Sequence, residues 1–164
     1  MLEVKNLTKI FSTGLFRRKE IVAIKNLSFK VQEGEFLSLV GESGSGKTTT
    51  ARIRLRLLPP TSGSVFFEGR DIWKLNGLKE LRWYWRHVHG IFQDSFASFN
   101  PFYKVDRVLY QAFNLLENHN LNKDSIIREA LKEVGLRPQD ILGRFPHELS
   151  GGQRQRIMIA RCYI

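Results

Sequence analysis

A glycine-rich segment between an apolar run and a helix-forming run constrains this chain more than any other feature of its sequence. Residues 41–48 read GESGSGKT and fit the pattern G-x-x-x-x-G-K-[ST] at every fixed position. The preceding run, FLSLV at residues 36–40, predicts a short apolar strand. Residues 47–58 predict a helix that ends before Pro59 and Pro60. A strand, a tight loop and a helix in this order are typical of an α/β fold.

The loop has the residue types that wrap a backbone around a phosphate group. Its glycines permit a close approach, so the N–H groups from about Gly44 to Thr49 can point at one anion, where the dipole of the following helix adds to the field. Lys47 supplies a charge for the β- and γ-phosphates, and the Thr48 hydroxyl can ligate Mg²⁺. The pattern therefore predicts a nucleoside triphosphate site, which GTPases, small-molecule kinases and helicases also have. The candidate binding residues are Gly41, Ser43, Gly44, Ser45, Gly46, Lys47, Thr48 and Thr49.

The rest of the chain changes from strand-forming to helix-forming patterns. Further strands are expected over residues 2–11, 21–31, 64–68 and 87–93, with a polar, basic insert at residues 12–20. Helices are expected over residues 105–117 and 123–134 and from Ser150 onward, with glycines and prolines at their joints. We therefore expect an α/β core at residues 1–94 and a helical part at residues 95–164.

A second short motif opens the last expected helix. Residues 149–153 read LSGGQ, in which Ser150 is a good N-cap and Gln153 completes a capping box three residues later. Gly151 and Gly152 leave the N–H groups of the first turn uncovered, which makes an anion site. A helix cap alone requires neither the two glycines nor the basic run Arg-Gln-Arg that follows. The motif therefore indicates a second phosphate-contacting site.

Together the two motifs resemble those of ABC ATPases, whose signature is LSGGQ at this separation of about a hundred residues from the phosphate loop. Residues 91–94, IFQD, resemble the Q-loop of that family, and Phe11 lies where an aromatic ring commonly stacks on adenine. The resemblance extends to about Arg161. It implies an α/β, P-loop NTPase core of the ABC type, with a mixed sheet that has an antiparallel part. A helical subdomain would carry the signature, and the C-terminal part of the family's domain would be absent.

The resemblance also implies a function, that of an ATP-binding subunit which couples ATP binding and hydrolysis to transport. Lys47 and Gln93 would act in catalysis, and Gln93 and Thr48 would contact Mg²⁺. In the family two such domains sandwich two nucleotides head to tail, and each site takes signature residues from the partner. The expected cofactors are ATP and Mg²⁺, and the expected partners are transmembrane permease subunits and a second ATP-binding subunit, on the cytoplasmic face of the membrane. The expected signature contacts to ATP are Ser150, Gly151, Gly152 and Gln153.

Several details are similar to the importers of oligopeptides, dipeptides and nickel. These are residues 41–44, the run from residue 92 through residues 97–101, and residues 145–148, FPHE, before the signature. Ser95 stands where that subfamily usually has proline, and Phe99 where it usually has leucine. A peptide or a related small solute is therefore the expected cargo class, and the residues do not specify it further.

Composition narrows the classes of protein that this chain can belong to. No apolar run approaches the roughly 18–20 residues that span a bilayer, and the single cysteine, Cys162, excludes a disulfide within the chain. The formal charge of +10, from 26 Lys+Arg against 16 Asp+Glu, suits phosphate-bearing partners, a nucleic acid or the anionic face of a membrane, and by itself it does not choose among them. One alternative is a soluble ABC ATPase acting on nucleic acid or the ribosome. A nucleic-acid partner is nevertheless not expected, because such proteins usually fuse two ATPase domains or insert coiled coils.

The carboxylates of the family's hydrolysis site do not occur among these residues. The sequence ends at Ile164, before the positions where the family has a metal-binding aspartate, a catalytic glutamate and a switch histidine. Weak ATP binding and negligible hydrolysis are therefore expected of residues 1–164 alone. An inactive fragment, serving at most as a non-catalytic binding partner, is the remaining alternative.

Overall fold

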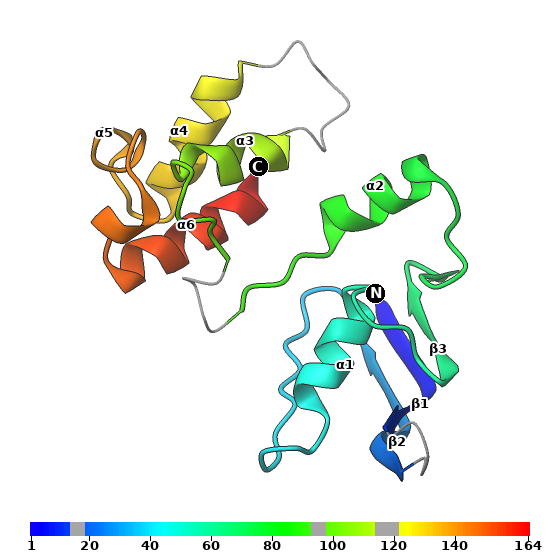
Figure 1. Cartoon of the computed structure of the whole chain (residues 1–164). Coiled ribbons are helices and arrows are strands. Elements are labelled where there is room, and N and C mark those ends of the chain that lie inside the picture. The colour runs from blue at the N-terminus through cyan, green and yellow to red at the C-terminus, as the bar shows by residue number, and fades with distance from the viewer. Residues whose placement is uncertain (14–18, 93–97, 114–121) are drawn as a thin grey trace. The chain divides into compact units, whose positions relative to one another are not determined.

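The computed structural model describes residues 1–13, 19–92, 98–113 and 122–164 (Figure 1). The chain divides into two units, Met1–Tyr84 and Trp85–Ile164, each held together by its own contacts. In the ranges that the structure describes, no helix is long and apolar enough to cross a membrane. The boundary expected between the α/β core at residues 1–94 and the helical part at residues 95–164 stays a prediction.

An antiparallel sheet of four strands forms the base of the first unit. The strand order is β2-β1-β3-β4, with β1 at Leu2–Thr13, β2 at Lys19–Val31, β3 at Ser62–Phe67 and β4 at Arg70–Asp71. Val4 faces Phe29 on one side and Val65 on the other, and both valines are buried. The strands predicted over residues 2–11, 21–31 and 64–68 are therefore confirmed, together with the antiparallel part of the sheet.

Gly63 allows β3 to approach β1 closely. It has φ +88°, and a Cβ at this position would lie 2.4 Å from the carbonyl oxygen of Asn6. A side chain here would force the two strands apart, so the start of β3 requires glycine.

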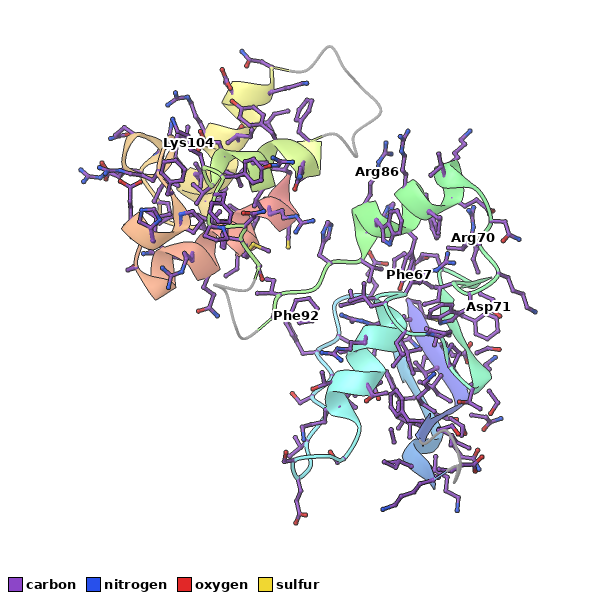
Figure 2. The ribbon with its side chains drawn as sticks, in the orientation of Figure 1. Phe67, Arg70, Asp71, Arg86, Phe92 and Lys104 are labelled. Carbon is purple, nitrogen blue, oxygen red and sulfur yellow. The ribbon has the colours of Figure 1, made fainter. Side chains whose placement is uncertain are left out.

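Aromatic residues pack beside the end of β3. Figure 2 labels Phe67, whose ring centroid lies 5.6 Å from that of Trp83 and 5.7 Å from that of Tyr84. The Arg70 guanidinium lies 4.5 Å from the Trp83 ring centroid, within the range of a cation–π contact. Tyr84 is fully buried, and its hydroxyl donates to the Arg54 carbonyl. These contacts hold the first turns of α2 (Leu78–His87) against the sheet unit.

Helix α1 (Lys47–Arg54) follows the phosphate loop as predicted, although it ends four residues before Leu58. The reason is a Schellman turn at its C-terminus. Arg56 has φ +57°, its N–H donates to the Ile53 carbonyl over 3.0 Å, and the Leu57 N–H donates to the Arg52 carbonyl over 2.9 Å. Arginine in this left-handed position is uncommon, so the sequence shows no usual stop signal there.

Two expected strands are wrong. Residues 36–40, predicted as an apolar strand, have no strand pairing, and residues 87–93 were predicted as a strand where α2 ends and residues 88–92 are irregular. A strand exists only when a neighbour completes its hydrogen bonds. The described residues supply no strand that pairs with either segment.

The second unit is helical, as predicted. It contains α3 (Asp106–Phe113), α4 (Lys123–Glu133), α5 (Pro138–Ile141), a 3₁₀ turn at Pro146–Glu148 and α6 (Gly151–Tyr163). Its core is a cluster of buried apolar side chains where α3, α4 and α6 meet. The largest fully buried members are Val105, Leu109, Ile127, Leu131, Ile141 and Ile157. Asp106 joins the start of α3 to the loop after α5, because its carboxylate accepts from the Gly143 N–H at 2.9 and 3.1 Å.

Candidate functional site

The phosphate loop takes its shape from glycines in left-handed conformations. Gly44 has φ +86° and Gly46 has φ +89°. A Cβ at Gly46 would also lie 2.4 Å from the Ala23 carbonyl oxygen on β2. Glycine at position 46 is therefore required for two reasons, the left-handed backbone angle and the close approach of β2.

Lys47 lies at the centre of this loop. Its ammonium donates to the carbonyl oxygens of Gly41 and Glu42 over 2.6 and 2.7 Å, and to the Ser45 hydroxyl over 3.2 Å. The loop backbone therefore curves around one half-buried positive charge. A phosphate oxygen that approached this charge would compete with two neutral carbonyl oxygens, and a charged acceptor makes the stronger hydrogen bond.

Backbone donors surround the same position. The N–H groups of Lys47, Thr48 and Thr49, in the first turn of α1, donate to no residue among those described. Such first-turn groups carry the positive end of the helix dipole. The donors and the ammonium thus fit an anion with several oxygens, which is the chemistry of a polyphosphate.

One hydroxyl could contact a metal ion held by that polyphosphate. The Thr48 side chain is exposed, whereas Thr50 is buried and its hydroxyl donates to the Gly46 carbonyl over 3.0 Å. Within the described ranges, no group of three or more histidine, cysteine, aspartate or glutamate residues could hold a metal ion. The exposed Thr48 hydroxyl therefore fits as one protein ligand to Mg²⁺ beside phosphate oxygens, because this ion is commonly bound through few protein groups together with substrate phosphates.

Phe11 lies on β1 opposite Ile21 of β2 and is half-buried. The Lys9 ammonium lies 5.2 Å from its ring centroid and also donates to the Pro59 carbonyl over 2.7 Å. A ring with a cation on it is not the open shelf on which a base would stack. Adenine stacking on Phe11 stays a prediction, and on the ring face that Lys9 contacts it would require Lys9 to move.

The signature begins α6 with the predicted capping box, which is confirmed. The Ser150 hydroxyl oxygen accepts from the Gln153 N–H over 3.2 Å, and the Gln153 side-chain oxygen accepts from the Ser150 N–H over 2.8 Å. The hydroxyl hydrogen of Ser150 remains available as a donor. The cap therefore orders the motif and leaves one side-chain donor at the helix start.

The two glycines of the signature are not required by the fold of this chain. A Cβ at Gly152 would have no atom within 4 Å, and a Cβ at Gly151 would meet only the far end of the Arg154 side chain at 3.9 Å. Neither glycine has a positive φ, and both are exposed. Their N–H groups donate to no described residue. A surface without side chains, at the positive end of a helix, fits close contact with an anion from outside the chain.

The arginines after the signature support the loops before it. Arg154 donates to the Pro146 carbonyl over 3.0 Å and to the Leu149 carbonyl. Arg156 donates to the Gly135 carbonyl over 3.2 Å. Glu148 accepts from the Phe145 N–H over 2.7 Å, and this bond lowers the pKa of its carboxyl. The basic run and Glu148 are thus accounted for by local structure.

The predicted nucleotide residues fall into separate parts of the molecule. The structure brings Gly41, Ser45 and Lys47 together in the first unit, and Ser150 and Gln153 in the second. Gln93, predicted to contact Mg²⁺ and to act in catalysis, lies outside the described residues. The ligand roles of all these residues stay predictions.

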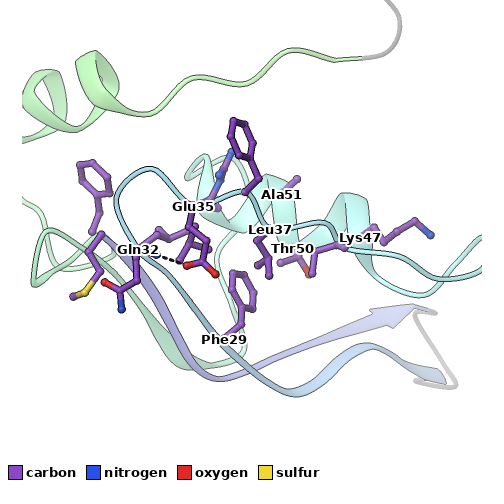
Figure 3. A pocket seen from close by; sticks show the side chains of 14 residues that line it. Phe29, Gln32, Glu35, Leu37, Lys47, Thr50 and Ala51 are labelled. Atoms are coloured by element: carbon purple, nitrogen blue, oxygen red, sulfur yellow. Dashed lines mark hydrogen bonds between the residues drawn. The ribbon is translucent and has the colours of Figure 1, made fainter.

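Sequence reasoning did not anticipate an apolar pocket of 610 Å³ in the first unit (Figure 3). Figure 3 shows Phe29 on the sheet and Leu37 facing each other, with Thr50 and Ala51 of α1 beside them. Lys47 also lines the pocket. The apolar run at residues 36–40, which predicts a short apolar strand, carries the only sequence signal for this pocket, because Phe36, Leu37 and Leu39 line it.

Comparisons with known proteins give consistent matches. Residues 24–164 match the family model described as ABC transporter. The oligopeptide transport ATP-binding protein AppF of Bacillus subtilis is 41% identical over 98% of this chain and 50% of its own length. OppF of Streptococcus mutans is 43% identical over 98% of this chain and 52% of its own length. The chain thus spans about half the length of these curated relatives.

Solved structures agree with the sequence matches. The ATP-binding cassette MJ0796, in a dimeric post-hydrolysis state bound to ADP and Pi, superimposes with a TM-score of 0.82 at 30% identity. The match covers 99% of this chain and 68% of that chain. A second similar structure, cbiO1 of Clostridium perfringens, has a TM-score of 0.73 at 25% identity over 98% of this chain and 60% of its own. The predicted fold class is therefore confirmed.

Proposed function

The chain belongs to the ABC transporter family, and we propose that it is an ATP-binding, energy-coupling subunit of an importer of peptides or related small solutes. The names of AppF and OppF as oligopeptide transport ATP-binding proteins support the cargo class. Because the chain spans about half the length of these relatives, the rest of such a protein would supply the remaining groups of the catalytic site.

The observation that carries the proposal is the charge at the centre of the phosphate loop. Among the residues that the structure describes, the Lys47 ammonium has only neutral oxygens as partners, and three first-turn N–H groups lie in the same part of the chain. When the β- and γ-phosphates bind, their oxygens replace the carbonyls of Gly41 and Glu42 at Lys47. The Thr48 hydroxyl would be one ligand of a Mg²⁺ ion, which would neutralise part of the phosphate charge.

The signature would contact the γ-phosphate of a nucleotide bound to a second subunit. The uncovered N–H groups of Gly151 and Gly152 and the hydroxyl of Ser150 are donors that nothing in the described chain occupies. The dimeric state of MJ0796 bound to ADP and Pi supports this arrangement. ATP would thus join two subunits, because each nucleotide is held by the loop of one chain and the signature of the other.

The coupling step would pass through Gln93 to permease subunits in the membrane. Gln93 follows residues 91–92 in the Q-loop-like segment, between the phosphate loop and the signature. We place the subunit at the cytoplasmic face of the membrane, where the permease partners would meet it. ATP-driven closure of the dimer and its reopening after hydrolysis would then move the permease.

Binding of MgATP to the purified chain tests the proposal. A ligand that binds only the folded state stabilises it by about 2.7 kcal/mol at a hundred times its Kd. We expect MgATP to raise the melting temperature of the wild type and not that of Lys47→Ala. Lys9→Ala is the matched control, because the Lys9 ammonium lies over the Phe11 ring on the sheet and not in the phosphate loop. The Lys9→Ala variant should keep the rise in melting temperature or increase it.

Two results would contradict the function. An equal shift in wild type and Lys47→Ala would show that the loop does not bind the nucleotide. A salt-dependent affinity for RNA without any effect of MgATP would instead favour a nucleic-acid-binding role.

A further inference from the structure

Contacts with the first unit fix how helix α2 is rotated about its own axis. The Trp83 ring packs beside Phe67, and the Arg70 guanidinium lies over it. Tyr84 is buried, and its hydroxyl donates to the Arg54 carbonyl. Because α2 is one continuous helix (Figure 1), these contacts also decide which of its residues point away from the sheet.

The side of α2 that lies away from Tyr84 combines apolar and basic side chains. At 3.6 residues per turn, four residues fall within an arc of about 120° there. This outer face consists of Leu78, Lys79, Arg82 and Trp85. All four residues are exposed, Leu78 to 70% and Trp85 to 40%. The outer face is thus amphipathic within itself, with two apolar side chains beside two cations.

The charges of the outer face have one sign. Among the described residues, none forms a salt bridge with Lys79 or Arg82. The acidic residue of the helix, Glu80, lies toward the opposite side, where its carboxylate accepts from the Asn76 N–H over 2.7 Å. Arg86 falls within the arc of the outer face and is half-buried. The outer face therefore complements an anionic surface.

Leu78 and Trp85 distinguish the outer face from a site for a soluble anion. An exposed leucine is not stabilised by a phosphate group, whereas it is stabilised in the apolar part of a lipid layer. Tryptophan favours the boundary between headgroups and acyl chains, because its ring is apolar and its N–H is polar. Lysine and arginine beside such residues reach the headgroup phosphates. This combination is typical of helices that lie on anionic membranes.

We propose that the outer face of α2 contacts the headgroup region of an anionic phospholipid bilayer. The inference rests on the proposed function, which places the subunit at the cytoplasmic face of a membrane. Two cations and two apolar side chains give weak, salt-sensitive binding, which would add to the contacts with the permease. Helix α2 ends at His87, and residues 91–94 are the Q-loop-like segment. The lipid contact would thus lie a few residues from the segment assigned to coupling.

Binding of the chain to lipid vesicles without any permease tests this inference. We expect the chain to sediment with vesicles of phosphatidylglycerol and phosphatidylcholine at low salt, and not with vesicles of phosphatidylcholine alone. High salt should weaken the binding, because it screens exposed charges. Arg82→Gln should weaken it about fivefold, the contribution of one cation close to an anionic membrane.

Matched variants separate the outer face from the charge of the whole chain. Lys25→Gln removes one exposed cation from β2 and should leave binding nearly unchanged. Leu78→Ser should weaken binding at least about threefold, because one apolar side chain no longer enters the lipid. Leu57→Ser is its control, since Leu57 is 63% exposed and lies outside α2.

Trp85 supplies a readout that does not depend on affinity. Phosphatidylcholine with a brominated acyl chain in the mixed vesicles should quench the tryptophan emission of the bound chain. Trp85→Phe should lose most of this quenching, because Trp73 and Trp83 are half-buried. Undiminished quenching in Trp85→Phe would overturn the placement of α2 on the membrane.

Each remaining outcome supports or overturns the inference. Equal weakening in Arg82→Gln and Lys25→Gln would assign the binding to the overall charge and overturn it. Binding to RNA that Leu78→Ser and Arg82→Gln abolish, without binding to vesicles, would assign the outer face to a nucleic acid and overturn it. Absence of binding to anionic vesicles at low salt would also overturn it, and the proposed function would stand if MgATP still stabilised the chain. Binding to vesicles without stabilisation by MgATP would support the lipid contact and contradict the proposed function.

Discussion

Replacing Gly152 with alanine should stabilise the chain while it impairs the proposed contact with ATP. A Cβ at this position would have no atom within 4 Å, and the residue lies in the first turn of α6 with an ordinary φ. Alanine in a helix is favoured over glycine by about 0.5–1 kcal/mol. For a chain of 164 residues this corresponds to a rise in melting temperature of up to about 2–4 °C.

The same substitution at Gly46 should have the opposite effect on the melting temperature. There φ is +89° and the new Cβ would lie 2.4 Å from the Ala23 carbonyl oxygen, a backbone atom that cannot move without distorting β2. The left-handed conformation alone costs about 1–2 kcal/mol for a residue with a side chain. Gly46→Ala should therefore lower the melting temperature, and the pair of variants controls for the change from glycine to alanine itself.

The predicted effect of Gly152→Ala on the contact with ATP is measured as MgATP-dependent dimerisation. The added methyl group would cover N–H groups that the proposed function assigns to the partner's γ-phosphate. Because a hydrogen bond to a charged group contributes about 1.5–3 kcal/mol, Gly152→Ala should weaken dimerisation at least about tenfold. Analytical ultracentrifugation with and without MgATP gives the dimer fraction. The sample also contains, as a separate polypeptide, the part of AppF that this chain does not match. A melting temperature lowered by more than 2 °C would refute the argument that the fold does not need this glycine.

Further predictions concern residues in both units. Ser150→Ala should cost about 1 kcal/mol in the free energy of unfolding, measured by urea titration, because it removes the N-cap of α6; an unchanged urea midpoint would show that the cap contributes nothing. Ile53→Ala, at a fully buried site, should cost about 2–5 kcal/mol, and a smaller loss would mean that the first unit refills the cavity. Burial raises the pKa of Tyr84 to about 12, so its contribution to stability is complete below pH 10 and is lost as the pH rises through 12. The stability difference between wild type and Tyr84→Phe should therefore shrink between pH 10 and 12, and a constant difference would contradict this assignment.

The sequence by itself determined the features that form between residues close to each other along the chain. The capping box of Ser150 and Gln153 joins residues three apart, and the loop around Lys47 joins residues within six positions. Such contacts depend on residue type and spacing alone. The two β-rich runs also show their pattern locally, since β1 and β2 are adjacent in sequence and pair with each other.

Only the tertiary structure decided the features that depend on distant partners. Residues 36–40 have the composition of a strand, but a strand forms only where another supplies its hydrogen bonds, and no described residue does so. The early end of α1 depends on Arg56 in a left-handed conformation, which residue type does not reveal. The need for glycine at positions 46 and 63 comes from the carbonyls of Ala23 and Asn6, strand residues distant in sequence. Propensity acts over a few residues, whereas pairing and close approach are properties of the assembled fold.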